Sequence, residues 1–222
     1  MPRLWVRAAL AVDVISSFHD TNITTTTIFR RIPAPNMSIS SLQDKVAIIT
    51  GCSSGIGLAT TRLFLERGAL VFGIDVNTPP LKLTQDFSTL IFYHADLTIS
   101  QAAEHAVAKC VGKHNRIDVL VNCAGVSDGW SSADSISDEE WERVMSINLT
   151  VPIRMMKAVL PAMKSQKEGG SIVNVASKAG NSGASAGIAY TASKHGLVCI
   201  LFSGAAIRRW QWWDGVLSTR LT

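Results

Sequence analysis

Hydrophobic residues between Lys45 and Ala176 gather in short runs that alternate with amphipathic segments. Runs typical of buried strands cover residues 46–50, 69–74, 90–94, 117–122 and 171–176. Helical periodicity covers 55–67, 99–113 and 138–165, a helical or irregular stretch covers 79–88, and a last helical segment begins near Ala189. Because helical crossovers join the strands, the strands should lie parallel. Right-handed crossovers would wind them into a doubly wound, three-layer Rossmann-type α/β domain.

The first part of the chain, residues 1–40, has no sustained period and contains a run of threonines. We expect a poorly ordered extension there. Its four Arg residues could suit a mitochondrial transit peptide, although Asp13 and Asp20 interrupt the basic face. Met37 stands directly before the first polar-then-buried pattern, so translation could also begin there. A cytoplasmic location is therefore the main expectation, and mitochondrial targeting is the minor one.

The last part of the chain, residues 201–222, also departs from the pattern and holds three of the six Trp residues. It neither alternates like a strand nor offers a clear turn back into a sheet. We expect the domain at 41–200 to lack its C-terminal strands, which would leave the segment 171–176 as an unpaired edge. The alternative is a helix extension in which Trp210 and Trp213 pack as ordinary core.

The composition is typical of a folded core without excess charge, since 47% of the residues are apolar and 17% are charged. The net charge of +4 arises at the two ends, because residues 37–200 hold fourteen basic and fourteen acidic side chains. We therefore expect no nucleic-acid partner. No apolar run reaches the ~18 residues that would predict a membrane span. The four cysteines lie far apart without histidines at metal-ligand spacing, so we expect no metal site.

A glycine-rich segment, G-C-S-S-G-I-G, separates the first strand from the first helix. The helix N-terminus would offer N–H donors and its positive dipole end to an anion. Gly51 would permit the tight turn, Gly55 the close approach of a pyrophosphate, and Gly57 the packing of helix on strand. Asp75, eighteen residues past Gly57, could accept hydrogen bonds from ribose hydroxyls and repel a 2′-phosphate. This pattern predicts NAD rather than NADP; the alternative is an Asp75 that only caps a surface turn.

Several motifs together resemble the short-chain dehydrogenase/reductase family. T-G-C-S-S-G-I-G at 50–57 is similar to its T-G-x-x-x-G-x-G signature, and N-C-A-G at 122–125 is similar to its N-N-A-G segment. Asn148, Ser177, Tyr190 and Lys194 match the order and spacing of its catalytic tetrad. The resemblance covers about residues 42–200. It implies cofactor contacts from Gly51, Ser53, Ser54, Gly55, Ile56, Gly57, Asp75, Asp96, Leu97, Asn122, Ala124, Gly125, Tyr190 and Lys194.

The candidate catalytic residues suggest hydride transfer between an alcohol and a carbonyl. Tyr190 and Lys194, four residues apart on a helix, project from one face, where a cation favours the ionised phenol. The resemblance implies that Tyr190 exchanges a proton with the substrate oxygen and that Lys194 holds the nicotinamide ribose. It also implies that Ser177 orients the substrate oxygen and that Asn148 holds a water in a proton relay. We expect an NAD(H)-dependent oxidoreductase that interconverts a secondary alcohol and a ketone.

Relatives in this family continue past the catalytic helix into a sixth strand, a P-G turn, a substrate lid and a seventh strand. None of these is recognisable in the sequence, so we expect a truncated dehydrogenase. The alternative function is a non-catalytic dinucleotide-binding or interaction protein. The expected partner is a small alcohol or ketone whose identity the sequence does not indicate, and homo-oligomerisation is left open.

Overall fold

The computed structural model describes residues 42–202, 209–213 and 216–221. The predictions for residues 1–40 therefore lie outside the described residues. The strands are β1 (Val46–Thr50), β2 (Leu70–Asp75), β3 (Leu90–His94), β4 (Val119–Asn122), β5 (Gly170–Val175), β6 (Arg209–Trp213) and β7 (Val216–Leu221). The α-helices are α2 (Gly55–Glu66), α3 (Leu81–Asp86), α4 (Ala102–His114), α5 (Asp138–Met145), α6 (Val151–Ser165) and α7 (Ile188–Phe202).

The strands form one sheet in the order β3-β2-β1-β4-β5-β7-β6. Strands β1 to β5 pair in parallel, as the sequence predicts, and the Rossmann-type α/β fold is confirmed. At the end of β1, Thr50 is level with Ile74 on one side and Asn122 on the other. The order reverses between β1 and β4, so the loops after these strands enclose the crevice where such sheets bind ligands.

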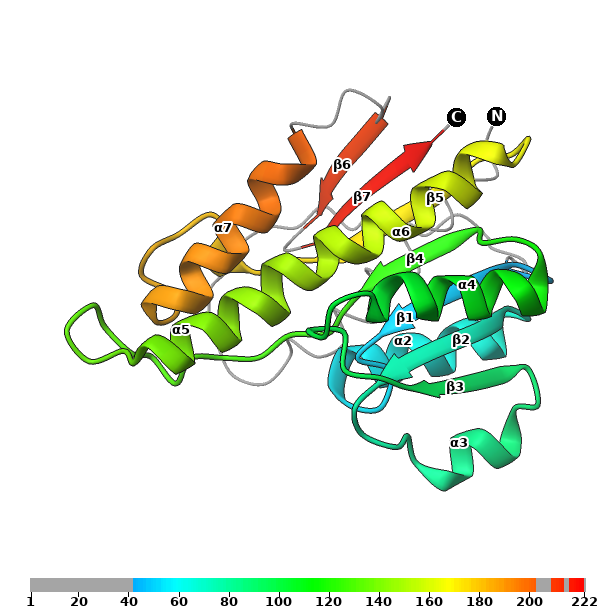
Figure 1. Cartoon of the computed structure of the whole chain (residues 1–222), viewed down its shortest axis with the longest axis horizontal. Helices are drawn as coiled ribbons and strands as arrows, with labels where there is room; N and C mark the ends of the chain where they lie inside the picture. Colours follow the sequence, from blue (N-terminus) through cyan, green and yellow to red (C-terminus); the bar gives the residue numbers. More distant parts are fainter. Residues whose placement is uncertain (1–41, 203–208, 214–215, 222) are drawn as a thin grey trace, which may run out of the picture.

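Helices cover both faces of the sheet, which gives the three expected layers (Figure 1). On one face, α4 and α6 bury Val107, Cys110 and Met155 against Ile48 and Leu120 of the strands. On the other face, α2 and α3 pack against the alternate residues of the same strands. The central strands are apolar on both sides because both sides are covered. This packing holds the ends of β1, β2 and β4 in a fixed arrangement.

The expectation that β5 forms an unpaired edge is wrong. Residues 209–213 and 216–221 form strands β6 and β7, and β7 pairs antiparallel with β5, from Gly170 opposite Leu221 to Val175 opposite Val216. β5 is therefore not an unpaired edge, and the segment that contains Trp210 and Trp213 is not a helix extension. A strand edge presents N–H and C=O groups that gain from pairing, and β7 supplies partners for those of β5.

The single helix expected over residues 138–165 is divided. α5 and α6 are joined by a π-helical turn at Ser146–Thr150, which contains Asn148. A π turn inserts one extra residue into the helix and shifts the side chains that follow it. Apolar periodicity continues through the turn, so the sequence pattern does not reveal it. Within the described residues, no helix is long and apolar enough to cross a membrane.

Candidate functional site

The predicted glycine turn forms between β1 and α2. Gly51 has φ +70° and Gly55 has φ +50°, the left-handed region that glycine tolerates best. A Cβ on Gly57 would overlap the carbonyl oxygen of Gly51, so only glycine fits at the start of the helix. The residue before Gly55, Ser54, is the exposed N-cap of α2 and its side chain makes no capping hydrogen bond. The turn leaves the first N–H groups of α2 facing the crevice, as an anion site requires.

The N-C-A-G segment after β4 packs against this turn. The Thr50 hydroxyl accepts hydrogen bonds from the N–H groups of Cys123 and Ala124, both at 3.1 Å. A Cβ on Gly51 would lie 2.9 Å from the backbone of Ala124. Asn122 is buried and donates to the side-chain oxygen of Asn174 on β5 at 2.8 Å, so it ties two strands together. The two predicted cofactor segments are therefore in direct contact.

Asp75 lies at the end of β2 beside the glycine turn. Its carboxylate accepts hydrogen bonds from the N–H of Ser53 at 3.0 Å and from the N–H of Asn77 at 2.9 Å. The Ser53 hydroxyl in turn donates to the carbonyl of Asn77. The half-buried carboxylate is thus held at the edge of the predicted cofactor crevice. Ile56 is half-buried in the first turn of α2.

Asp96 and Leu97 follow β3, and their side chains lie in different surroundings. The Asp96 carboxylate is exposed and accepts hydrogen bonds from the N–H and the hydroxyl of Thr98, at 2.9 and 2.7 Å. The side chain of Leu97 is buried in the core under α4 and α6. The N–H of Ala95 donates to the Asp75 carbonyl at 3.1 Å, which brings this loop to the end of β2.

The predicted pair Tyr190 and Lys194 shares one face of α7. The Lys194 ammonium lies 5.6 Å from the centroid of the Tyr190 ring, within cation–π range. The same ammonium donates to the carbonyl of Val175, at the end of β5, at 2.8 Å. Helix α7 is thereby fixed to the sheet at the level of the crevice. The phenol and the ammonium meet as the spacing of four residues predicts.

Lys194 is 5% exposed, which is rare for a lysine. Burial lowers the pKa of its ammonium to about 8, and the attraction of Cys123 opposes this change. Burial likewise raises the pKa of the Cys123 thiol to about 12, opposed by the Lys194 charge. Cys123 is therefore a neutral thiol throughout the pH range in which Lys194 loses its proton. Within the described residues, no carboxylate forms an ion pair with the Lys194 ammonium.

Asn148 sits in the π-helical turn and is 1% exposed. Its side-chain oxygen accepts from the N–H of Val126 at 2.8 Å, and its amide donates to the Val126 carbonyl at 2.9 Å and the Ser193 hydroxyl at 3.2 Å. A Cβ on Gly125 would lie 3.3 Å from the Asn148 oxygen and 3.8 Å from the Lys194 ammonium. Asn148, Gly125 and Lys194 therefore meet at one point.

Ser177 follows β5 and caps the short helical turn Lys178–Gly180, where its hydroxyl accepts from the N–H of Ala179 at 3.1 Å. This turn packs on α7, because a Cβ on Gly180 would lie 2.8 Å from the side chain of Val198 and 3.0 Å from the carbonyl of Lys194. The candidate serine and the candidate lysine thus lie on elements in direct contact.

A residue that the sequence pattern missed also contacts this helix. Asp128, in the loop after β4, is 0% exposed, and its carboxylate accepts a hydrogen bond from the N–H of Tyr190 at 2.8 Å. In the sequence it stands in V-S-D-G-W, which reads as an ordinary polar turn. No local signal connects it to a helix that starts sixty residues later.

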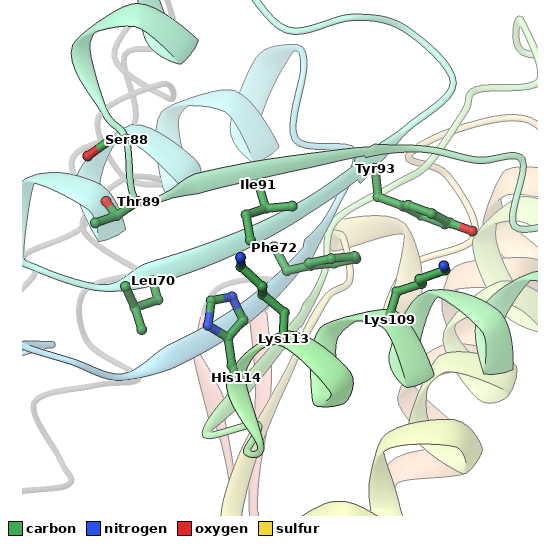
Figure 2. Close-up of a pocket in the computed structure, with 9 residues that line it drawn as sticks. All are labelled: Leu70, Phe72, Ser88, Thr89, Ile91, Tyr93, Lys109, Lys113 and His114. Atoms are coloured by element: carbon green, nitrogen blue, oxygen red, sulfur yellow. The ribbon is translucent and has the colours of Figure 1, made fainter.

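A separate cavity of about 590 Å³ lies between α4, strand β2 and the edge strand β3. Figure 2 shows three basic side chains of α4 facing an apolar strand surface; its lining is Leu70, Phe72, Ser88, Thr89, Ile91, Tyr93, Lys109, Lys113 and His114. Burial lowers the pKa of His114, and the neighbouring Lys113 charge adds to this. None of the predicted cofactor or catalytic residues lines this cavity. In the described part of the chain, no group of three His, Cys, Asp or Glu side chains could hold a metal ion.

Comparison with known proteins places this chain in a family. Residues 45–206 match the short chain dehydrogenase family. The short chain dehydrogenase adrF of Penicillium rubens is 51% identical over 160 residues, which are 72% of this chain and 62% of that protein. Asnovolin H dehydrogenase nvfC of Aspergillus novofumigatus is 51% identical over 161 residues, with the same 72% and 62% coverage.

Solved structures agree with this result. A short chain dehydrogenase from Mycobacterium smegmatis superposes with a TM-score of 0.66 at 32% identity, and the match covers 72% of this chain and 69% of that one. The protein therefore belongs to the short-chain dehydrogenase family, whose members are oxidoreductases that use a nicotinamide dinucleotide. The chain spans 62% of the length of the curated relatives described above.

Proposed function

We propose that this protein interconverts a secondary alcohol and a ketone with NAD(H), and that Ser177, Tyr190 and Lys194 carry the reaction. The observation that supports this most strongly is the position of the Lys194 ammonium. It lies under the Tyr190 ring, bonds to Val175 and borders Gly125, so the catalytic helix and the cofactor loops converge on it.

The residues around the crevice fit a dinucleotide. The space that a Cβ would fill at Gly51 and Gly57 is taken up by backbone, which keeps the turn tight and its N–H groups open to a pyrophosphate. Asp75 is available to the adenosine ribose, and Lys194 to the nicotinamide ribose. The bound dinucleotide would accept the hydride as NAD⁺ and supply it as NADH.

The chain's own residues would supply positioning and one proton. The Tyr190 phenol donates its proton to the substrate oxygen during reduction and takes it back during oxidation. The Ser177 hydroxyl hydrogen-bonds the same oxygen and holds the substrate carbon in line with the nicotinamide. The buried Lys194 cation stabilises the phenolate left on Tyr190, because the low polarity of its surroundings strengthens the attraction. Asn148 holds the loop at Val126 against Ser193, and so supports the floor beneath Lys194.

The preference for NAD follows from the charge of Asp75. A 2′-phosphate on the adenosine ribose would approach a carboxylate that already sits at the end of β2, and like charges in a half-buried site repel. The ribose hydroxyls of NAD would instead donate to the same oxygens. We therefore expect NADH to be used in preference to NADPH.

The proposal is tested with the full chain and a panel of ketones that includes both cyclic and open-chain compounds. Asnovolin H joins the panel in the oxidative direction, because a relative named for it is 51% identical. We expect NADH-dependent reduction of at least one ketone, and a loss of at least about 100-fold in kcat for Tyr190→Phe with NADH binding retained. Tyr93→Phe, the other tyrosine of the chain, is the matched control and should keep full turnover.

NADH binding without turnover of any compound would favour the alternative, a non-catalytic dinucleotide-binding protein. Full turnover by Tyr190→Phe would refute the acid/base role of the phenol. A preference for NADPH would refute the role given to Asp75 while leaving the reaction class intact.

A further inference from the structure

The first turn of α7, which carries Tyr190, is capped from a distant part of the chain. The helix is preceded by Gly187, which has no side chain to accept a hydrogen bond from the free N–H groups of the first turn. The N–H of Ile188 instead donates to the carbonyl of Ser131 at 2.9 Å, and the N–H of Tyr190 donates to the Asp128 carboxylate at 2.8 Å. The cap therefore comes from the loop after β4, sixty-two residues before Tyr190.

The burial and the hydrogen bonds of Asp128 favour this contact. It is fully buried, and its second oxygen accepts from the N–H of Trp130 at 3.3 Å. Its carbonyl accepts from the N–H of Ser131. A buried carboxylate is costly unless it is hydrogen-bonded, and the N-terminal end of a helix is a favourable place for it. The described partners of the carboxylate are backbone N–H groups, so its charge is balanced by the helix end rather than by a cation.

Gly187, which has no side chain, leaves the space that this carboxylate fills. A Cβ on Gly187 would lie 2.5 Å from one Asp128 oxygen and 2.6 Å from the other. The residue has no positive φ, so its backbone alone would accept alanine. A side chain here would displace the carboxylate, because the carboxylate occupies the space of a Cβ. The two residues form a matched pair across the start of α7.

The loop that holds Asp128 is itself fixed to α5. The guanidinium of Arg143 donates to the carbonyl of Ser127 at 3.0 Å, and the Ser131 hydroxyl donates to Glu140 at 2.7 Å. Asp128 therefore fixes the backbone of Tyr190 relative to a loop that α5 holds in place. On the other side of Tyr190, Lys194 is held by β5. The Tyr190 phenol therefore lies between two separate points of attachment, the Asp128 loop and strand β5.

We propose that Asp128, seated against Gly187, is a positioning residue that fixes the Tyr190 phenol for proton transfer. This inference rests on the proposed function of Tyr190. Without the carboxylate, the first turn of α7 loses one capping bond and can fray or shift. A displacement of about 1 Å of a reacting group can lower a rate about 100-fold.

The test compares Asp128→Ala, Gly187→Ala and the double variant in the full chain, with NADH and a ketone that the wild type reduces. We expect kcat to fall about 10- to 100-fold in each single variant while the Kd of NADH changes less than about threefold. The double variant should be no slower than Asp128→Ala, because the alanine methyl then occupies the vacated space. Asp134→Ala, an exposed carboxylate of the same loop, is the matched control and should keep the wild-type kcat.

Two results would overturn the proposal: a wild-type kcat in Asp128→Ala, or single effects that multiply in the double variant. If Asp128→Ala does not fold, Asp128→Asn replaces it. Asparagine keeps one acceptor oxygen for two N–H donors, so its kcat should fall between those of wild type and Gly187→Ala, and a wild-type kcat would contradict the proposal.

Amide hydrogen exchange separates this inference from the proposed function, because it needs no turnover. The Tyr190 N–H should exchange slowly in the wild type and at least tenfold faster in Asp128→Ala. If the wild type lacks activity but this difference is observed, the proposed function fails while the capping contact stands. An unchanged exchange rate at Tyr190 refutes the contact, whatever the activity.

Discussion

Replacing Lys194 with methionine should make the unliganded protein more stable although it destroys the candidate site. Among the residues that the structure describes, the buried ammonium has no carboxylate partner, and burial holds its pKa at about 8 in the folded state. In the unfolded chain the ordinary lysine value of about 10.4 applies. Between these two values the unfolded state binds more protons than the folded state, so wild-type stability must rise as the pH rises through this window. Below it, the full cost of the buried charge is present.

The size of this cost follows from the same two values. A difference of a little over two pH units corresponds to roughly 3 kcal/mol at pH 7. Methionine removes the charge with similar volume but also removes the hydrogen bond to the Val175 carbonyl, which costs about 1 kcal/mol. We therefore expect Lys194→Met to unfold with a free energy about 2 kcal/mol higher than wild type at pH 7. In a chain of this size, that is an increase of about 4–8 °C in Tm.

The assay is urea unfolding at pH 7 and at pH 10, without cofactor, followed by tryptophan fluorescence. The advantage of Lys194→Met over wild type should shrink or reverse at pH 10, because wild-type Lys194 is then neutral in the folded protein. Lys157→Met changes an exposed lysine of α6 and should show no such pH-dependent difference. A Lys194→Met protein that is less stable than wild type at pH 7, or a stability difference independent of pH, would refute the reasoning.

Three further changes test other parts of the site. Asp75→Ala should raise the kcat/KM ratio of NADPH to NADH about 10- to 100-fold, measured by initial rates; an unchanged ratio means that Asp75 lies away from the ribose. Gly57→Ala should weaken NADH binding at least tenfold in fluorescence titration, because the added methyl overlaps the Gly51 carbonyl; wild-type affinity would contradict the tight turn. Thr50→Val should raise the Kd of NADH severalfold, since the N–H groups of Cys123 and Ala124 lose their shared acceptor, and an unchanged Kd would show that this bond does not hold the crevice.

The sequence predicts the parallel part of the sheet well, because those strands are buried on both sides and read as continuous apolar runs. The expected segment 46–50 coincides with β1, and the expected 171–176 differs from β5 by one residue at each end. Glycine positions in the turn are equally readable, since Gly51 and Gly57 are required by backbone geometry that the motif itself encodes. Features that depend only on residues close in the sequence can therefore be predicted from it.

Contacts between segments that lie far apart in the sequence cannot be predicted in this way. Asp128 caps a helix sixty residues later, and nothing in V-S-D-G-W distinguishes it from a solvated turn. The π-helical turn at Asn148 lies within unbroken apolar periodicity. The tail does carry a local sequence signal for strands: the dipeptide Asp214-Gly215 stands between two β-prone segments, a pattern typical of hairpins.

The proposed function requires that the glycine turn and the Tyr190–Lys194 pair serve one bound nicotinamide dinucleotide. A crystal structure of the full chain with NADH tests it most directly. We predict that the pyrophosphate lies against the backbone of Gly51 to Gly57 and that the Tyr190 phenolic oxygen faces the nicotinamide. A phenolic oxygen directed away from that ring, or a dinucleotide bound elsewhere, would contradict the account.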